Sequence, residues 1–465
     1  MNKNKHIHFI GICGVAMSAL AIALNKKGHQ VSGSDKGFYP PVSTKLKNSS
    51  IQFYPGWHPD KMNKNGEPDL VIVGNVASSN NPEWNYIQQN DIEYQSYPEF
   101  IEENMIAENS LVCAGSYGKT SCTSLLSWIL NSSDYNPNYM FGGLAQMEDF
   151  PHGKISEESN WSVIEGDEYK SARWDSQPKF NHYSPTHLLL SSIVWDHADI
   201  FPTQQNYKNT FVNLVKNIPE DGVKILSEQA YNKLQGELAE KPITYGKNER
   251  NDYYYTDFSQ TKSGISFKVH KKEEKFAIES PMLGKYMAEN ITGCFAMTDQ
   301  IGIEPKKIIS AIEKFQGLKR RLERRLTGKV DVYDDIAHSP EKAKAALKTI
   351  NKIYDEKIIA VFEPNTGNRK TKAIPNYKNA FQSADEVVIP RLSKIKQKED
   401  DPNPPFGGEK LAEVVDKTHE NVKYIEDDFE LVDHLTNSSR PGGAVIFLGS
   451  HGFIRMIEMT VDALS

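Results

Sequence analysis

The chain has 465 residues, of which 38% are hydrophobic, 25% charged and 10% aromatic. This length exceeds what one hydrophobic core normally supports, and this composition excludes wholesale disorder, so we expect several globular domains and predict three. The 61 acidic and 54 basic residues give a net charge of −7, which excludes the global basic field that drives nonspecific nucleic-acid binding. No nucleic-acid partner is therefore expected.

The cysteines and the apolar runs indicate the compartment. The four cysteines lie far apart without a C-x-x-C pair, which argues against a zinc ribbon or a disulfide framework. The first residues are basic, but no long apolar core or small-residue cleavage site follows, so we interpret them as the approach to a first strand. No apolar run reaches the roughly 20 residues that span a bilayer. We expect a cytoplasmic protein without stable membrane insertion.

A strand, a glycine turn and a helix open the chain over residues 6–25, and a second strand follows. Gly11 and Gly14 lie in the turn, and Asp35 follows the second strand. This pattern is typical of a Rossmann-like domain that holds a diphosphate at a helix N-terminus. Met17 stands where a third glycine would complete the fingerprint. A diphosphate site and a turn needed only for packing both remain open.

The sharpest local signal is LVCAGSYGKTSCTSLLSWIL at residues 111–130, which predicts a strand, a glycine-rich loop and a helix. Glycines let backbone amides approach phosphate oxygens, Lys119 supplies a charge, and the Thr120 hydroxyl can ligate magnesium. The loop is shorter than G-x-x-x-x-G-K-S/T, but its context favours an ATP phosphate loop over an ordinary turn. The loop residues predicted to bind ATP are Gly115, Ser116, Gly118, Lys119, Thr120 and Ser121.

Acidic residues follow two later predicted strands. The strand at 161–164 leads into Glu165, and the strand at 188–194 leads into Asp196 and His197. Acidic side chains at strand ends beside a phosphate loop are well placed to hold a metal ion that bridges phosphates. Taken alone, each cluster is more often a solvated turn.

The ordered set of these segments resembles the Mur ligases over nearly the whole chain. The segments are HIHFIGICGVAMSALA, GSD at 33–35, AGSYGKTS, IEGDEY at 164–169, DHADIF at 196–201, KRRLE at 319–323 and DDIAHSP at 334–340. The resemblance implies an α/β protein of three consecutive domains. These are a Rossmann-like domain at 1–108 for the UDP-sugar, a central P-loop ATPase-like domain at 109–324 for ATP, and a Rossmann-like domain at 325–465 that closes over both.

Within the family, three segments look more like murein peptide ligases than like the enzymes that add L-alanine. They are YPPVST at 39–44, WDHADIF at 195–201 and FEP at 362–364. This likeness implies that UDP-N-acetylmuramate is joined to the tripeptide L-alanyl-γ-D-glutamyl-meso-diaminopimelate through an acyl phosphate, with ATP and Mg²⁺ as cofactors. The L-alanine ligase is the close rival. A nicotinamide-dependent oxidoreductase and a non-catalytic UDP-sugar-binding protein are alternatives of other classes, and the oligomeric state is open.

The resemblance also implies roles for individual residues. Thr120, Glu165 and His197 match the metal ligands, and Asn290 and Arg321 match nucleotide-binding positions. The catalytic set would be Lys119, Glu165, His197, Asp335 and His338. The contacts to the UDP-sugar would come from Gly11, Gly14, Met17, Ser34 and Asp35.

Three departures from the family pattern put part of this set in doubt. Tyr286 and the next residue replace a His-Asn pair that contacts adenine, and Tyr286 is interpreted either as a purine-stacking side chain or, more often in such a helix, as core packing. Ser339 replaces a second histidine. Asn365 stands in place of an arginine, so we hypothesise that Arg369 or Lys370 recognises the peptide carboxylates.

Overall fold

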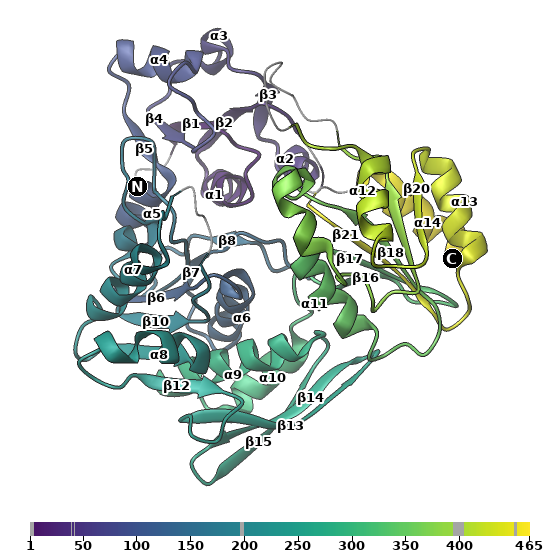
Figure 1. The fold of residues 1–465 in the computed structure, drawn as a ribbon. Coiled ribbons are helices and arrows are strands. Elements are labelled where there is room, and N and C mark those ends of the chain that lie inside the picture. The colour runs from purple at the N-terminus through teal and green to yellow at the C-terminus, as the bar shows by residue number, and fades with distance from the viewer. Residues whose placement is uncertain (1–3, 39, 41, 196–199, 394–403, 451–452) are drawn as a thin grey trace. The chain divides into compact units, whose positions relative to one another are not determined.

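The computed structural model describes residues 4–38, 40, 42–195, 200–393, 404–450 and 453–465 (Figure 1). The chain forms two compact units. The first holds residues 1–259, 266–281 and 286–316, and the second holds 260–265, 282–285 and 317–465. No helix among the described residues is long and apolar enough to cross a membrane.

The first sheet of unit one is parallel, with the order β3-β2-β1-β4-β5. Its strands are β1 (His6–Ile10), β2 (Gln30–Asp35), β3 (Gln52–Pro55), β4 (Leu70–Val73) and β5 (Tyr94–Ser96). Its helices are α1 (Val15–Lys26), α2 (Val42–Asn48), α3 (Pro59–Met62), α4 (Pro82–Gln89) and α5 (Tyr97–Asn104). β1 and β4 are buried throughout, as expected for the middle of a parallel sheet. The predicted Rossmann-like start is therefore confirmed.

The second sheet of unit one has ten strands in the order β15-β14-β13-β12-β11-β10-β6-β9-β7-β8. The strands are β6 (Asn109–Ala114), β7 (Asn138–Met140), β8 (Gly153–Lys154), β9 (Trp161–Gly166), β10 (His187–Leu190), β11 (Val223–Ser227), β12 (Ile243–Gly246), β13 (Tyr253–Thr261), β14 (Gly264–Lys271) and β15 (Glu274–Ser280). The helices are α6 (Lys119–Ser132), α7 (Gln204–Lys216), α8 (Glu228–Leu234), α9 (Lys285–Gln300) and α10 (Pro305–Lys314), with a 3₁₀ turn η1 (Lys179–Tyr183). β6 lies between β9 and β10 with parallel pairing on both sides, so the loop after β6 emerges at the same sheet edge as the loops after its neighbours.

The two sheets of unit one share one hydrophobic core. Residues of α1 such as Leu20 and of β6 such as Val112 belong to the same buried cluster. At the contact of α1 with β8, a Cβ atom added to Gly153 would lie 3.2 Å from Cβ of Ala19. This joint core could not be predicted from the sequence, because apolar periodicity shows which face of an element is buried but not which surface packs against it.

Unit two is built on a six-stranded sheet with the order β16-β17-β21-β18-β19-β20. The strands are β16 (Glu323–Leu326), β17 (Asp331–Asp335), β18 (Ile358–Glu363), β19 (Glu386–Pro390), β20 (Val422–Ile425) and β21 (Ala444–Gly449). The helices are α11 (Pro340–Ile350), α12 (Gly408–Asp416), α13 (Asp428–Ser438) and α14 (Met456–Leu464). β16 pairs antiparallel with β17, and the other pairs are parallel. The three-part α/β architecture is confirmed, while the predicted boundary after residue 324 falls inside β16.

One predicted strand is shorter than expected. The apolar run 188–194 predicted a strand of that length, but β10 ends at Leu190. Beyond it, Ser191 donates its hydroxyl to the carbonyl of Tyr117, and the carbonyl of Ser192 accepts the amide of Ser116. The chain leaves the sheet here because its polar groups are bonded to the phosphate loop.

Candidate active site

The glycine-rich loop joins β6 to α6, and its two glycines have conformations that other residues rarely adopt. Gly115 has φ +129° and Gly118 has φ +88°. A Cβ atom would lie 2.6 Å from Oγ of Ser191 at Gly115, and 2.9 Å from Oδ1 of Asn290 at Gly118. Backbone approach at both positions therefore requires glycine. The same geometry places Asn290 of α9, a predicted nucleotide-binding residue, against the loop. Because the loop lies directly before the N-terminus of α6, it fits the phosphate chain of a nucleotide.

Thr120 and Glu165 form a pair at the start of α6 and the end of β9. The Thr120 hydroxyl donates to Oε1 of Glu165 at 2.6 Å, and the amide of Gly142 donates to Oε2 at 2.6 Å. Burial raises the pKa of Glu165, the nearby Asp167 adds to this, and the two hydrogen bonds oppose it. A hydroxyl and a carboxylate oxygen are hard ligands of the kind that Mg²⁺ takes, so the two predicted metal ligands fit a magnesium ion.

His197, the third predicted metal ligand, lies outside the described residues. Among the residues that the structure describes, no group of three or more His, Cys, Asp and Glu side chains is placed to hold a metal. The metal prediction therefore depends on Thr120 and Glu165.

The Lys119 side chain lies among carboxylates. Its Nζ is 2.7 Å from Oε2 of Glu168 and 4.0 Å from Oδ1 of Asp167, and Lys179 is 3.1 Å from the other oxygen of Asp167. Burial lowers the pKa of Lys119, but Glu168 and Asp167 outweigh burial and raise it, so the ammonium stays charged. Burial likewise raises the pKa of Asp167, and Lys179 and Lys119 outweigh it and lower that pKa. Sequence reasoning missed Lys179, because η1 carries no motif.

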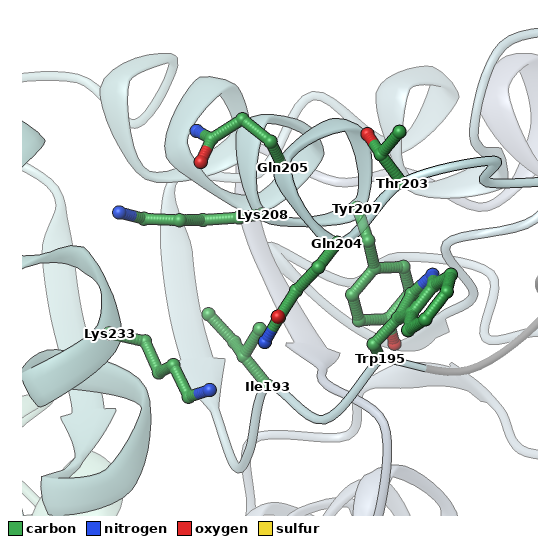
Figure 2. Close-up of a pocket in the computed structure, with 8 residues that line it drawn as sticks. All are labelled: Ile193, Trp195, Thr203, Gln204, Gln205, Tyr207, Lys208 and Lys233. Carbon is green, nitrogen blue, oxygen red and sulfur yellow. The ribbon is translucent and has the colours of Figure 1, made fainter.

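Tyr207 of α7 is a second residue that sequence reasoning missed. Its hydroxyl lies 2.7 Å from Oγ of Ser116, a predicted ATP-binding residue. Figure 2 shows Tyr207 in the wall of a pocket of about 390 Å³ that also carries Trp195, Lys208 and Lys233. The pocket and the phosphate loop therefore share this tyrosine.

The predicted UDP-sugar contacts surround the turn after β1. Gly11 has φ +93°, and a Cβ there would lie 2.5 Å from Cγ1 of Val76. Asp35 accepts the amide of Cys13 at 2.8 Å, which fixes the turn from β2. Burial raises the pKa of Asp35, and the Cys13 hydrogen bond opposes it.

Of the remaining N-terminal candidates, Met17 and Ser34 have buried side chains. Met17 lies in the shared core, and Ser34 donates its hydroxyl to Glu83 at 2.5 Å. Gly14 is the N-cap residue of α1 and has no side chain to cap it, so the helix N-terminus keeps backbone donors for another acceptor. Substrate binding by these residues stays a prediction.

The C-terminal candidates Arg321, Asp335 and His338 lie together in unit two. Asp335 accepts the amides of Leu322 and Ala337, both at 2.8 Å. Burial raises the pKa of Asp335, and Arg321 opposes it. Burial also lowers the pKa of His338, with Lys342 as the next cause, so its imidazole is neutral at pH 7. Asp335 is the last residue of β17 and is buried there, so its carboxylate does not belong to a solvated turn.

Asp334, beside this group, should make stability fall as the pH rises. Burial raises its pKa to about 6, against the opposing charge of Arg320 at 3.4 Å. A raised carboxyl pKa stabilises the fold fully below the ordinary value of 3.8, and that stabilisation is lost as the pH rises through 6. Asp334→Asn should therefore unfold with the same free energy as the parent near pH 3 and about 3 kcal/mol more at pH 8, measured by urea denaturation. Equal differences at both pH values would contradict the prediction.

Arg369 is buried and bonded to the backbone of its own unit. Its Nε donates to the carbonyl of Phe406 at 3.0 Å, and its Nη1 donates to the carbonyl of Ser393 at 3.2 Å. Burial lowers its pKa, and Glu363 opposes this. Lys370, next in the chain, is half-buried. Ser339, which replaces a histidine of the family pattern, is the N-cap of α11 and accepts the amide of Lys342.

Tyr286 was expected most often to pack in the core, and this is wrong. The side chain is 44% exposed, whereas Met287, Ala288 and Ile291 form the buried face of α9. Asn290 follows Tyr286 by one helical turn and lies against Gly118. The sequence KYMAEN is compatible with either face, so periodicity could not place this residue.

Comparison with known proteins assigns the family. A Mur ligase family catalytic domain matches residues 6–109, a Mur ligase middle domain 113–298, and a Mur ligase glutamate ligase domain 320–451. The UDP-N-acetylmuramate–L-alanyl-γ-D-glutamyl-meso-2,6-diaminoheptandioate ligase of Haemophilus influenzae is 31% identical over 79% of this chain and 81% of its own length. The Escherichia coli enzyme of the same name is 29% identical over 99% and 98%.

A solved structure supports the same fold. The UDP-N-acetylmuramate–alanine ligase of Thermotoga maritima superposes with a TM-score of 0.81 at 21% identity and covers 99% of both chains. Together with the three matched domains and the 31% identical relative, this shows that the chain belongs to the Mur ligase family.

Proposed function

We propose that the protein joins the carboxylate of UDP-N-acetylmuramate to the tripeptide L-alanyl-γ-D-glutamyl-meso-diaminopimelate in peptidoglycan recycling. As a Mur ligase it is an ATP-dependent, ADP-forming enzyme that uses Mg²⁺. The observation that carries the substrate pair is the identity of 29–31% to two ligases named for it, one of them over 99% of the chain.

The phosphate-loop geometry supports the chemistry. A carboxylate does not accept an amine until transfer of the γ-phosphoryl group of ATP makes it an acyl phosphate, from which the amine displaces phosphate. Lys119 places a fixed positive charge at the loop, and Thr120 and Glu165 would hold Mg²⁺, which neutralises charge on the transferring oxygens. The side chains thus act by placement and charge rather than by covalent chemistry.

The enzyme is proposed to act in the cytoplasm, where ATP and UDP-sugars are available. Its cysteines support a reducing compartment, because Cys113, Cys122 and Cys294 are buried thiols that take no part in a disulfide framework.

The second candidate is the L-alanine-adding activity. It is favoured by the likeness to the T. maritima enzyme, whose TM-score is 0.81. That comparison at 21% identity concerns the fold, which ligases of one family share, so it does not rank the two activities. The tripeptide activity ranks first because the Haemophilus influenzae ligase is 31% identical, against 29% for an L-alanine ligase of Streptococcus agalactiae.

The deciding experiment measures phosphate release with ATP, Mg²⁺ and UDP-N-acetylmuramate, with the tripeptide, L-alanine or no amine in parallel, and identifies each product by mass. Release that depends on the tripeptide, with a UDP-muramoyl-tripeptide product, is expected. Release with L-alanine alone would move the chain to the second candidate. Nucleotide binding without turnover in any reaction would instead favour a non-catalytic binding protein.

Recognition of the tripeptide carboxylates is proposed for Lys370 or Arg369, and alanine at each separates them. Because the Arg369 guanidinium bonds two backbone carbonyls, Arg369→Ala should lower the free energy of unfolding by about 1–3 kcal/mol. Lys370→Ala should raise KM for the tripeptide about tenfold with little change in KM for ATP. An unchanged KM for tripeptide in both variants would remove the pair from peptide recognition.

A further inference from the structure

Glu168 is a buried residue whose two carboxylate oxygens accept hydrogen bonds from two different helices. It follows β9 by two residues and is 1% exposed. Its Oε2 accepts Nζ of Lys119 at 2.7 Å, and its Oε1 accepts the hydroxyl of Tyr207 at 3.2 Å. A buried carboxylate is costly unless donors satisfy it, and here one donor comes from α6 and the other from α7.

Tyr207 links Glu168 to Ser116, which lies at the start of the phosphate loop. Its ring is fully buried between Phe201 and Phe211, with ring centroids at 5.0 and 5.1 Å, so its hydroxyl has little freedom. That hydroxyl lies 2.7 Å from Oγ of Ser116, and Oγ also accepts the amide of Val194 at 2.7 Å.

The protons of this chain of groups are constrained at both ends. The Val194 amide donates to Ser116, and the Tyr207 hydroxyl donates to Glu168. The single proton of the Ser116 hydroxyl points to Tyr207 or to the carbonyl of Val194, each 2.7 Å away. Ser116 and Lys119 lie on either side of Gly118 in the loop, so a single carboxylate reaches both ends of the loop by separate contacts.

We propose that Glu168 and Tyr207 are positioning residues for phosphoryl transfer: Glu168 aims the Lys119 ammonium, and through Tyr207 it fixes Ser116 at the start of the loop. This assignment rests on the proposed ligase function. Placement matters in such a reaction because a displacement of about 1 Å in a reacting group can cost about 10²-fold in rate.

The test compares Tyr207→Phe, Glu168→Gln and the double variant by kcat and by KM for ATP. Tyr207→Phe keeps the buried ring and should lower kcat about tenfold, and Glu168→Gln should lower it about 10²-fold, with KM for ATP changed less than about threefold. The double variant should be no slower than Glu168→Gln, because both act through one carboxylate.

Two control variants separate positioning from loss of structure. Tyr245→Phe removes another buried hydroxyl of the same unit, for which the described residues offer no hydrogen-bond partner, and it should keep the parent kcat. Glu168→Asp restores the charge and should recover part of the kcat that Glu168→Gln loses. Melting temperatures of all variants check that they fold.

Two results would overturn the assignment: Tyr207→Phe behaving like Tyr245→Phe, or losses in the single variants that multiply in the double variant. Either result in an active parent enzyme leaves the proposed ligase function intact. A parent enzyme that releases no phosphate with any amine would overturn the ligase function and this assignment with it.

Discussion

Replacement of Lys119 by methionine should lower kcat for amine-dependent phosphate release by about 10³-fold. Methionine keeps much of the apolar stem and removes the positive charge that the structure places at the start of α6, beside Glu168 and Asp167. Because the loss concerns charge that develops during transfer, kcat should fall much more than KM for ATP rises.

The variant also leaves Glu168 with one donor fewer, so folding must be controlled. Lys154 provides the matched control, because its Nζ is bonded to Asn131 at 2.8 Å and Asn136 at 2.6 Å in the same unit. Lys154→Met should lose stability and keep kcat. Comparable kcat losses in the two variants would show that Lys119 acts through the fold rather than at the reacting phosphate.

The phosphate loop and the Thr120–Glu165 pair were within reach of sequence reasoning for a physical reason. The loop has a local motif, and the carboxyl ends of parallel strands meet at one sheet edge. β9 pairs with β6 so that Glu165 lies opposite Cys113, close to the loop. The type and order of the strands were therefore enough to predict that the threonine and the carboxylate would meet.

The contacts that hold Lys119 and Ser116 were beyond sequence reasoning. Tyr207 lies 91 residues from Ser116 along the chain, and nothing in its own helix marks it as different from the other aromatic residues that face the core. Lys179 reaches Asp167 from a 3₁₀ turn without a motif. Such pairs depend on how α7 and η1 pack against β9, which a hydrophobic pattern does not specify.

The shared core of unit one was missed for a related reason. Apolar residues of α1 predicted a buried face, but the pattern could not show that the face packs on β8 as well as on its own sheet. The exposed Tyr286 shows the converse, since one aromatic residue at the start of α9 fits either side of the helix. In both cases the surface against which the helix packs, rather than the local sequence, determines which side chains are buried.

Replacement of Glu165 by glutamine should lower kcat by about 10²-fold or more and raise the Mg²⁺ concentration needed for half-maximal rate. Glutamine keeps one acceptor for the amide of Gly142 and replaces the carboxylate that accepts the Thr120 hydroxyl. Because burial raises the pKa of Glu165, a neutral side chain is at least as stable there as the carboxylate, so the melting temperature should hold or rise while activity falls.

The matched control is Glu386→Gln, which removes another buried carboxylate and should have the opposite effects on the melting temperature and the Mg²⁺ dependence. Despite burial, hydrogen bonds from Lys357 at 2.7 Å and from His434 lower the pKa of Glu386, so its charge stabilises unit two. That variant should melt earlier and keep its Mg²⁺ dependence. Measuring the rate at a series of Mg²⁺ concentrations, together with thermal melting, distinguishes the two variants. If Glu165→Gln needs the same Mg²⁺ concentration as the parent, Glu165 does not belong to the metal site, whatever the effect on kcat.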